Sequence, residues 1–285
     1  MSSWKRLLLA LSALAALCGC SGTDILNFTI PRTGYTLHRD IAYGNNPRQK
    51  LDVYMPDKPA PGHPVIVFFY GGSWQSGKKS NYLFAGQAFA SKGFTAVIAD
   101  YRLYPEVYFP DFMKDAAHAV RWTHKHIRDY GGNPENLFLS GHSSGGYLAV
   151  MLTLNARYLK DAGGQVEWIK GTAGMAGPYD FLPFTDPKIK AIFSKLPNPD
   201  SQPINYARTG LPPMLLMTGD KDTQVLPRNT INLTARLQAL NDCVTERIYP
   251  GVAHIGIVLS LASGFRGKAP VLEDIAAFVQ QHTKK

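Results

Sequence analysis

The sequence predicts an α/β fold in which a mostly parallel β-sheet carries helices on both faces. From residue 64 to the C-terminal end, apolar runs of strand length alternate with segments of helical periodicity. Two segments of alternating polarity precede them, which predicts an antiparallel N-terminal edge. The 285 residues are enough for one large domain, and no Ser/Gly/Pro-rich linker divides them.

The antiparallel edge is expected at residues 35–42 and 50–55, and the continuously apolar run 64–69 is expected to be a strand buried on both faces. Further strands are expected at residues 94–99, 136–139, 168–175, 213–217 and 244–249. Helical patterns lie between them at residues 82–90, 111–128, 144–154, 228–240 and 271–281. In such sheets, functional groups collect on the loops at the carboxyl ends of the strands.

The segment 177–213 departs from this alternation, because it is rich in proline and aromatic residues and has no clear strand pattern. We expect it to form short helices that act as a cap or pocket wall over the functional site. An ordinary long connection is the alternative.

The pentapeptide Gly-His-Ser-Ser-Gly at residues 141–145 lies between a predicted strand and a predicted helix. This context places Ser143 on a sharp turn that exposes its hydroxyl, and Gly141 and Gly145 leave room for the neighbouring chain. The backbone N–H of Ser144, at the start of the helix, would point at a developing oxyanion. Ser143 is therefore a candidate nucleophile.

A serine nucleophile needs a histidine base, and His254 is the candidate among the eight histidines. It follows the predicted strand 244–249 through a Pro-Gly turn, so it is expected on a loop at the carboxyl end of a strand. A structural loop histidine is the alternative. His142, next to the nucleophile, is expected to point away from Ser143.

The base needs a carboxylate that holds it in the right tautomer, and two aspartates follow the predicted strand 213–217. We favour Asp222 as the orienting acid and Asp220 as a loop-capping residue. This choice rests partly on the family resemblance described below. The order Ser, Asp, His along the chain fits the architecture.

A second oxyanion donor is expected from the segment Tyr70-Gly71-Gly72-Ser73-Trp74, which directly follows the buried strand 64–69. Its glycines leave the backbone amides unobstructed, so Gly71 and Gly72 are the candidate donors. A plain Gly-Gly turn is the alternative. Trp74 is expected either to line the pocket or to fill space behind it.

Five segments together resemble the serial motifs of α/β-hydrolase carboxylesterases. They are YGGSWQSG, DYRLYPE, GHSSGG, GDKDTQV and GVAHIG. The resemblance extends from about Lys50 to the C-terminus and is to the hormone-sensitive-lipase-like, isoprenylcysteine methylesterase and kynurenine formamidase groups. It implies an α/β-hydrolase catalytic domain over residues 34–285. The site residues that it implies are Ser143 as nucleophile, His254 as base, Asp222 as orienting acid, and Gly71, Gly72 and Ser144 as oxyanion donors.

The chain departs from these groups at Tyr70, where they usually carry a histidine that supports the loop. The departure therefore bears on loop geometry more than on the chemistry. The run Asp100-Tyr101-Arg102 also matches the groups, and the resemblance implies a structural role for it at the edge of the sheet.

The expected function is that of a serine carboxylesterase, which hydrolyses small to medium carboxylic esters through an acyl-enzyme. An amidase, formamidase or peptidase with the same triad is the enzymatic alternative, and a non-catalytic binding protein is a third reading. We expect no organic cofactor and no metal. The formal net charge is +9, but the basic residues form no run, so no nucleic-acid partner is expected. The sequence leaves the oligomeric state open.

The N-terminal residues have the pattern of an export signal. Lys5 and Arg6 precede an apolar stretch that is too short to span a bilayer, which predicts a signal peptide over residues 1–19. The local sequence resembles a bacterial lipobox with Cys20 as the lipid attachment site. Residues 20–33 would then tether the protein to a membrane, and Ser21 favours the outer membrane where a cell has two. Secretion in soluble form is the alternative.

Overall fold

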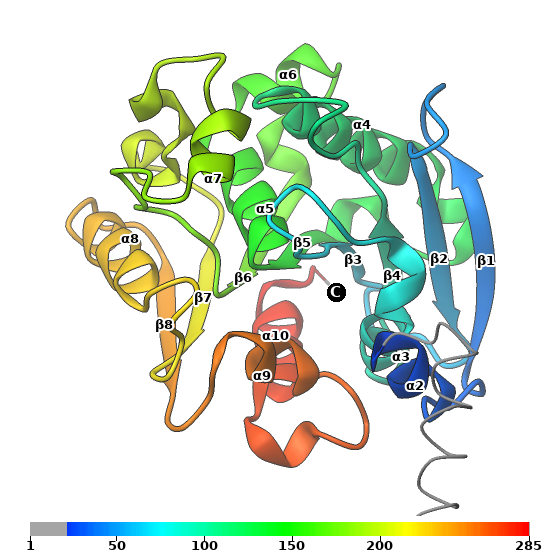
Figure 1. The fold of residues 1–285 in the computed structure, drawn as a ribbon. Coiled ribbons are helices and arrows are strands. Elements are labelled where there is room, and N and C mark those ends of the chain that lie inside the picture. Colours follow the sequence, from blue (N-terminus) through cyan, green and yellow to red (C-terminus); the bar gives the residue numbers. More distant parts are fainter. Residues whose placement is uncertain (1–21, 285) are drawn as a thin grey trace, which may run out of the picture.

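Within residues 22–284, which the computed structural model describes, an eight-stranded sheet forms the centre of the molecule (Figure 1). The strand order is β1-β2-β4-β3-β5-β6-β7-β8. The β1/β2 and β2/β4 pairs are antiparallel, and the other neighbours are parallel. The predicted α/β fold with its antiparallel N-terminal edge is therefore confirmed.

The strands are β1 (Tyr35–Ala42), β2 (Lys50–Pro56), β3 (Val65–Phe69), β4 (Thr95–Ala99), β5 (Leu137–His142), β6 (Ile169–Met175), β7 (Met214–Gly219) and β8 (Val244–Tyr249). Every residue of β3 and β4 is buried, in keeping with their continuous apolar runs. Strand β5 continues to His142, three residues beyond the predicted end. Its last residues are small or polar, so apolar periodicity did not mark them as strand.

The helices are α2 (Gly22–Phe28), α3 (Leu83–Ser91), α4 (Asp111–His126), α5 (Ser144–Leu154), α6 (Arg157–Asp161), α7 (Pro187–Ile192), α8 (Arg228–Gln238), α9 (His254–Leu259) and α10 (Val271–His282). Short 3-10 turns cover Lys79–Tyr82, Ile127–Tyr130, Pro134–Asn136, Val166–Trp168, Asn198–Ser201, Pro203–Tyr206 and Arg266–Lys268. Figure 1 shows α4 and α5 on one face of the sheet and α3 and α10 on the opposite face.

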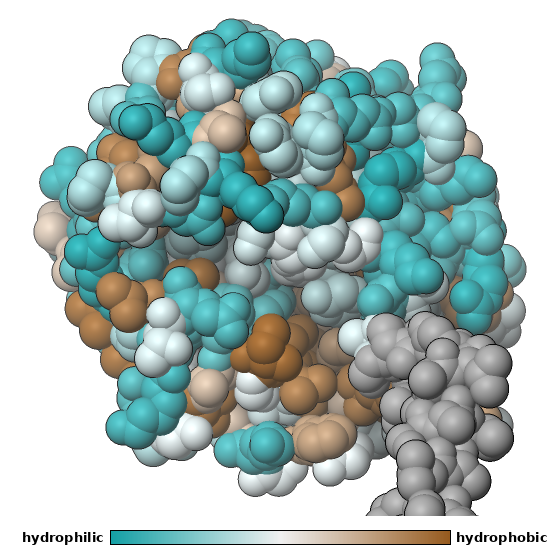
Figure 2. All heavy atoms as spheres, viewed as in Figure 1, coloured by the Kyte–Doolittle hydropathy of each residue, from teal (hydrophilic) through white to brown (hydrophobic). Residues whose placement is uncertain are grey.

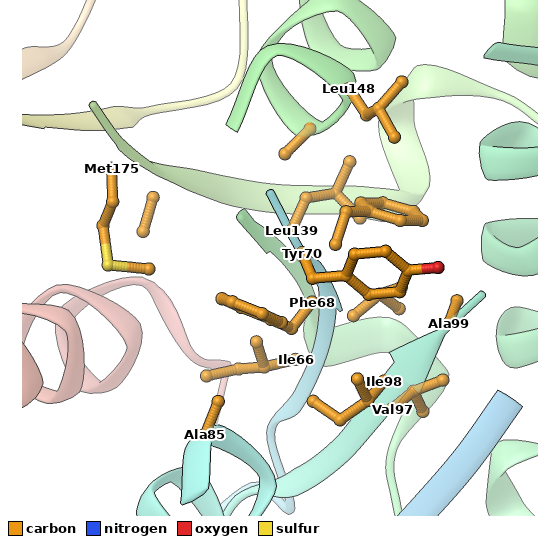
Figure 3. Packing of buried hydrophobic residues seen from close by; sticks show 14 of the residues in the cluster. Ile66, Phe68, Tyr70, Ala85, Val97, Ile98, Ala99, Leu139, Leu148 and Met175 are labelled. Carbon is orange, nitrogen blue, oxygen red and sulfur yellow. The ribbon is translucent and has the colours of Figure 1, made fainter. Parts of the chain in front are cut away.

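The core lies between the sheet and these helices. Figure 3 shows side chains from β3, β4, β5 and α5 meeting there, among them Phe68, Val97, Leu139 and Leu148. Helix α5 is buried along its whole length, as expected of a helix that is apolar on all sides. A core packed to this extent holds the ends of β3 and β5 in fixed positions, and the candidate site is built on those ends.

The segment 177–213 contains α7 and two 3-10 turns, Asn198–Ser201 and Pro203–Tyr206. It is thus made of short helical pieces, as its composition predicts. Its phenylalanines pack against one another, with ring centroids 5.5 Å apart for Phe181 and Phe193 and also 5.5 Å apart for Phe184 and Phe193. This aromatic packing holds the segment over the carboxyl ends of the strands.

The expected signal peptide 1–19 and Cys20 lie outside the described residues. Within the expected tether 20–33, residues 22–28 form α2. The Asn27 side chain donates hydrogen bonds from Nδ2 to the carbonyl oxygens of Ser80 (2.9 Å) and Asn81 (3.2 Å), which fixes α2 to the body. Among the helices of residues 22–284, none combines the length and apolarity needed to cross a membrane.

Candidate active site

Ser143 lies on a sharp turn between β5 and α5, with φ 56° and ψ −125°. A non-glycine residue in this region is strained, as is typical of a nucleophile at a strand-to-helix turn. The flanking glycines are needed sterically. A Cβ on Gly145 would collide with the carbonyl oxygen of Phe69, and one on Gly141 would collide with that of Gly145. The turn is therefore built as the sequence predicts.

Ser143, His254 and Asp222 form one chain of hydrogen bonds. His254 Nε2 is 2.9 Å from Ser143 Oγ, and His254 Nδ1 is 2.7 Å from Asp222 Oδ2. Because an ionised carboxylate can only accept, Nδ1 carries the proton and Nε2 is free to accept the hydrogen of the Ser143 hydroxyl. All three residues are buried. The structure thus brings together three side chains from the ends of β5, β7 and β8.

Asp222 is held in place by its second carboxylate oxygen. Oδ1 accepts hydrogen bonds from the backbone N–H groups of Gln224 (3.0 Å) and Val225 (2.9 Å). Asp220 instead accepts from the backbone N–H of Gly251 at 2.7 Å and so closes the turn that leads toward His254. The structure therefore places Asp222 behind the imidazole and gives Asp220 a capping role.

His254 is the first residue of α9, where the sequence led us to expect a loop. The short helix was missed because its six residues carry no periodic signal of their own. Ile255, next in the chain, is 50% exposed, and Figure 2 shows hydrophobic residues gathered over α9. An apolar surface thus adjoins the candidate base.

His142 is a neighbour of the site that the sequence did not assign to it. Its Nε2–H donates to the backbone carbonyl oxygen of His254 at 2.9 Å, and the two imidazole rings are 4.7 Å apart. Burial, together with the proximity of His254, lowers the pKa of His142 to about 3. The ring is therefore neutral at ordinary pH and places no positive charge beside the candidate base.

The glycine segment after β3 lies against the nucleophile, since a Cβ on Gly71 would be 2.9 Å from the Cβ of Ser143. Gly72 has φ 141°, and a Cβ there would collide with the carbonyl oxygen of Ser76. Both positions thus require glycine. Ser144 is the first residue of α5, so its N–H has no acceptor within the helix.

The amides of Gly71, Gly72 and Ser144 all remain candidate oxyanion donors. Gly71 also gives the close approach of the chain to Ser143.

A pocket of about 380 Å³ opens onto Ser143. Its walls come from the glycine segment, the start of α5, the segment 177–213 and the loop after Asp222. The lining residues are Ser73, Trp74, Ser143, Ser144, Pro178, Phe181, Pro183, Phe184, Thr185, Asp186, Ile189, Gln224, Val225, Leu226, Arg228 and Asn229. The segment 177–213 is therefore a wall of the pocket that contains the candidate nucleophile.

Trp74 packs between the wall of this pocket and helix α4. Its ring is stacked 6.2 Å from Phe181 of the wall and 5.9 Å from Phe112 of α4. It also meets the edge of Phe193, 4.9 Å away. Two roles were expected for Trp74, lining the pocket or filling space behind it. The structure gives it both, because Trp74 lines the pocket and is only 3% exposed.

The described residues contain no group of three or more His, Cys, Asp or Glu side chains placed to hold a metal ion.

A family model described as BD-FAE matches residues 51–237 of this chain. A probable isoprenylcysteine alpha-carbonyl methylesterase of Arabidopsis thaliana, ICMEL1, is 28% identical over 78% of this chain and 52% of its own length. Esterase LipC of Mycobacterium tuberculosis is 27% identical over 87% of this chain and 66% of its own length. The chain thus spans about half to two thirds of these curated relatives. The predicted resemblance to isoprenylcysteine methylesterases is confirmed.

Solved structures agree on the fold. Esterase B from Lactobacillus rhamnosis superposes with a TM-score of 0.78 and 18% identity, covering 98% of this chain and 96% of that one. The propionate-bound esterase 2 of Thermogutta terrifontis gives 0.71 and 23%, covering 88% of this chain and 96% of that one. The sheet and its helices are thus those of an α/β-hydrolase fold.

Proposed function

The chain belongs to the BD-FAE family of α/β-hydrolase carboxylesterases, and from this premise we propose that it is a serine carboxylesterase acting on small to medium carboxylic esters. The observation that carries the proposal is the continuous hydrogen-bond chain from Asp222 through His254 to Ser143, which ends in an open pocket. The relatives named above are esterases, which supports the same reaction class.

The first half-reaction forms an acyl-enzyme. His254 Nε2 takes the proton of the Ser143 hydroxyl as Oγ attacks the ester carbonyl carbon. The carbonyl oxygen becomes an oxyanion that accepts hydrogen bonds from the amides of Gly72 and Ser144. Asp222 stabilises the imidazolium that forms. The imidazolium then protonates the leaving alcohol as the tetrahedral intermediate collapses.

The second half-reaction releases the acid. A water molecule replaces the alcohol and gives a proton to His254 as it attacks the acyl carbon. A second oxyanion forms against the same two amides, and its collapse returns the proton to Ser143 Oγ. Each step uses the three hydrogen-bonded side chains, the two amides and, in the second half-reaction, one water molecule.

The pocket supports the proposed substrate size. About 380 Å³ lies at the lower end of the range of roughly 300 to 1,000 Å³ that is usual for small-molecule sites. Trp74, Phe181 and Phe184 form its aromatic wall, which suits an apolar acyl or alkoxy group. Gln224 and Arg228 add polar groups. The Thermogutta esterase with bound propionate offers a precedent for a short acyl group in this fold.

The test is hydrolysis of p-nitrophenyl acetate and butyrate by the purified protein, with Ser143→Ala as the control. Turnover by the wild type and its loss in the variant are expected. The absence of turnover for every ester in a broad panel would remove the proposal and favour a binding protein. A parallel set of anilides and formamides with the same acyl groups tests the amidase alternative, since a preference for amides at matched acyl groups would reassign the reaction.

The N-terminal residues carry a second part of the proposed function, which is export. We propose that residues 1–19 direct export as a lipoprotein signal peptide and that Cys20 carries the lipid, with the outer membrane as the destination where a cell has two membranes. The support is the basic start, the short apolar stretch and the Leu-Cys-Gly-Cys sequence before Ser21. Mass spectrometry of the N-terminal peptide from a bacterial host tests it. A mature chain that begins elsewhere than at Cys20, or that lacks acyl groups, would refute it.

A further inference from the structure

We propose that Arg48, from the turn between β1 and β2, is a positioning residue for the oxyanion loop, defined here as residues 70–77. No sequence motif marks this arginine, and it lies outside the pocket. The inference rests on the proposed function, because the loop carries the candidate oxyanion donor Gly72. The guanidinium group of Arg48 makes three hydrogen bonds around this loop.

Arg48 connects the two ends of the loop. Its Nη2 lies 2.8 Å from the Tyr70 hydroxyl oxygen and 2.9 Å from the Gly77 carbonyl oxygen. These are the first and last residues of the loop, and one nitrogen with two hydrogens can donate to both. The Nε–H donates to the carbonyl oxygen of Tyr101, 2.9 Å away. The guanidinium thus ties both loop ends to the segment that follows β4.

Tyr70 directly precedes Gly71 and Gly72, so the contacts that hold its side chain also restrain the position of these glycines. Its ring is fully buried and stacked between Tyr82, with centroids 5.4 Å apart, and Tyr101, at 4.9 Å. Figure 3 shows the ring within the core and its hydroxyl turned toward Ala99 of β4. That hydroxyl donates to Asp100 Oδ1 at 2.7 Å while it accepts from Arg48. Its donor and acceptor capacities are therefore both used.

The charge of Arg48 is also matched at this position. Its Nη2 is 3.9 Å from Asp100 Oδ1, which also accepts the backbone N–H of Lys79 at 2.7 Å. The Asp100 side chain is 14% exposed and that of Arg48 is 30% exposed. A largely buried carboxylate with a cation and two donors around it is well satisfied, so the cluster has one preferred geometry.

The loop is placed where small shifts affect chemistry. Gly71 is packed against Ser143, and the Gly72 amide follows it directly. An oxyanion donor works only at about 2.7 to 3.1 Å from the position of the oxyanion, so a displacement of several tenths of an ångström weakens it. Lysine is a poor substitute for Arg48, because its single nitrogen cannot occupy both the Nε position that donates to Tyr101 and the Nη2 position that donates to Tyr70 and Gly77.

The experiment compares Arg48→Gln with Arg102→Gln. Arg102 is a matched control because its side chain is 25% exposed and its guanidinium pairs with the buried Asp115 at 2.7 Å. The hydrogen bonds of its guanidinium likewise go to Asp115 and not to residues 70–77. With active sites counted by the extent of labelling with a fluorophosphonate, we expect Arg48→Gln to lower kcat on p-nitrophenyl butyrate about 10- to 100-fold, with KM within about threefold. This loss is smaller than the loss of kcat of about 10²- to 10³-fold that follows removal of an oxyanion donor, because the donor is displaced and not removed.

A transition-state analogue separates positioning from stability. A trifluoromethyl ketone forms a tetrahedral oxyanion on Ser143, so its inhibition constant should rise in Arg48→Gln in proportion to the loss of kcat/KM. Arg102→Gln should lower the melting temperature by a similar amount, with kcat and the inhibition constant within about twofold of wild type. Tyr70→Phe combined with Arg48→Gln should cost less than the sum of the two single changes, because the two side chains belong to one hydrogen-bond network.

A readout without catalysis keeps the inference separate from the proposed function. Hydrogen exchange of a peptide that covers residues 70–77 should be faster in Arg48→Gln and unchanged in Arg102→Gln. If the wild type hydrolyses esters but Arg48→Gln matches it in kcat per labelled site and in the inhibition constant, the inference is refuted alone. If no ester is hydrolysed, the proposed function fails, and wild-type exchange rates in Arg48→Gln would then refute the inference as well.

Discussion

The Nε2–H of His142 donates to the backbone carbonyl oxygen of His254 at 2.9 Å, so one buried histidine fixes the main chain of another. The carbonyl can only accept, and this assigns the proton of His142 to Nε2. His142 Nδ1 is buried, with no hydrogen-bond partner among the described residues. A second proton on this ring would thus be buried without an acceptor, in agreement with the lowered pKa of His142.

The first prediction concerns stability at acid pH. The pKa of His142 is about 3 in the folded protein, against 6.5 for an ordinary histidine, so the unfolded chain binds a proton below about pH 6.5 that the folded protein does not. The contribution of neutral His142 to the free energy of unfolding is therefore complete above pH 6.5. It is lost as the pH falls toward 3, by about 1.4 kcal/mol per pH unit. Urea unfolding of wild type and His142→Gln at pH 7, 5.5 and 4.5 should show a shallower decline in the variant. Parallel declines would contradict the assignment.

The second prediction concerns the hydrogen-bond chain. Ser143→Ala and His254→Ala should each lower turnover by about 10⁴ to 10⁶, because either change removes the activated nucleophile. The two changes together should cost about as much as one alone, since the groups act as a unit. Far-UV circular dichroism and melting temperature should stay close to wild type. Residual turnover above a hundredth of wild type in either variant would exclude the mechanism.

The third prediction separates the two aspartates of the loop after β7. Asp222→Asn should lower kcat about 10³- to 10⁴-fold, because an amide in place of the carboxylate allows the wrong tautomer of His254. Asp220→Asn should retain kcat within about threefold, since Asp220 bonds a turn amide and not the imidazole. Steady-state kinetics on one chromogenic ester, with equal labelled sites, measures both. Equal losses in the two variants would contradict the assignment.

The fourth prediction concerns the pocket wall. Phe181→Ala removes an aromatic side chain that lines the pocket and stacks on Trp74. The added space should raise the ratio of kcat/KM for p-nitrophenyl octanoate over acetate by about tenfold, the range that one or two methylene contacts supply. Phe28→Ala is the control, because Phe28 is 88% exposed on α2. An unchanged ratio in Phe181→Ala would mean that the segment 177–213 does not set acyl preference.

The sequence alone located those strands and site residues that are marked by patterns of neighbouring residues in the chain. Apolar runs located the central strands, and the Gly-His-Ser-Ser-Gly pentapeptide between a predicted strand and a predicted helix selected Ser143. The rule that functional groups follow strand ends selected His254. Asp222 also required the family resemblance, because Asp220 lies on the same loop. The backbone of this loop decides between them, since only Asp222 has its carboxylate behind the imidazole.

The features that were missed depend on contacts between residues far apart in the chain. Arg48 lies 22 positions from Tyr70 and 53 from Tyr101, and no local pattern marks such a cluster. The short helices α2 and α9 depend on packing against the body, because isolated helices of this length are unstable.

The docking of α2 has a consequence for how the protein would stand on a membrane. Gly22 begins this helix only two positions after Cys20, so a lipid on Cys20 would leave almost no slack between bilayer and enzyme. The catalytic domain would then stay at one distance from the bilayer and in one orientation, instead of moving freely on a flexible linker. Which esters it meets would then depend on their height above the lipid headgroups as well as on their fit to the pocket.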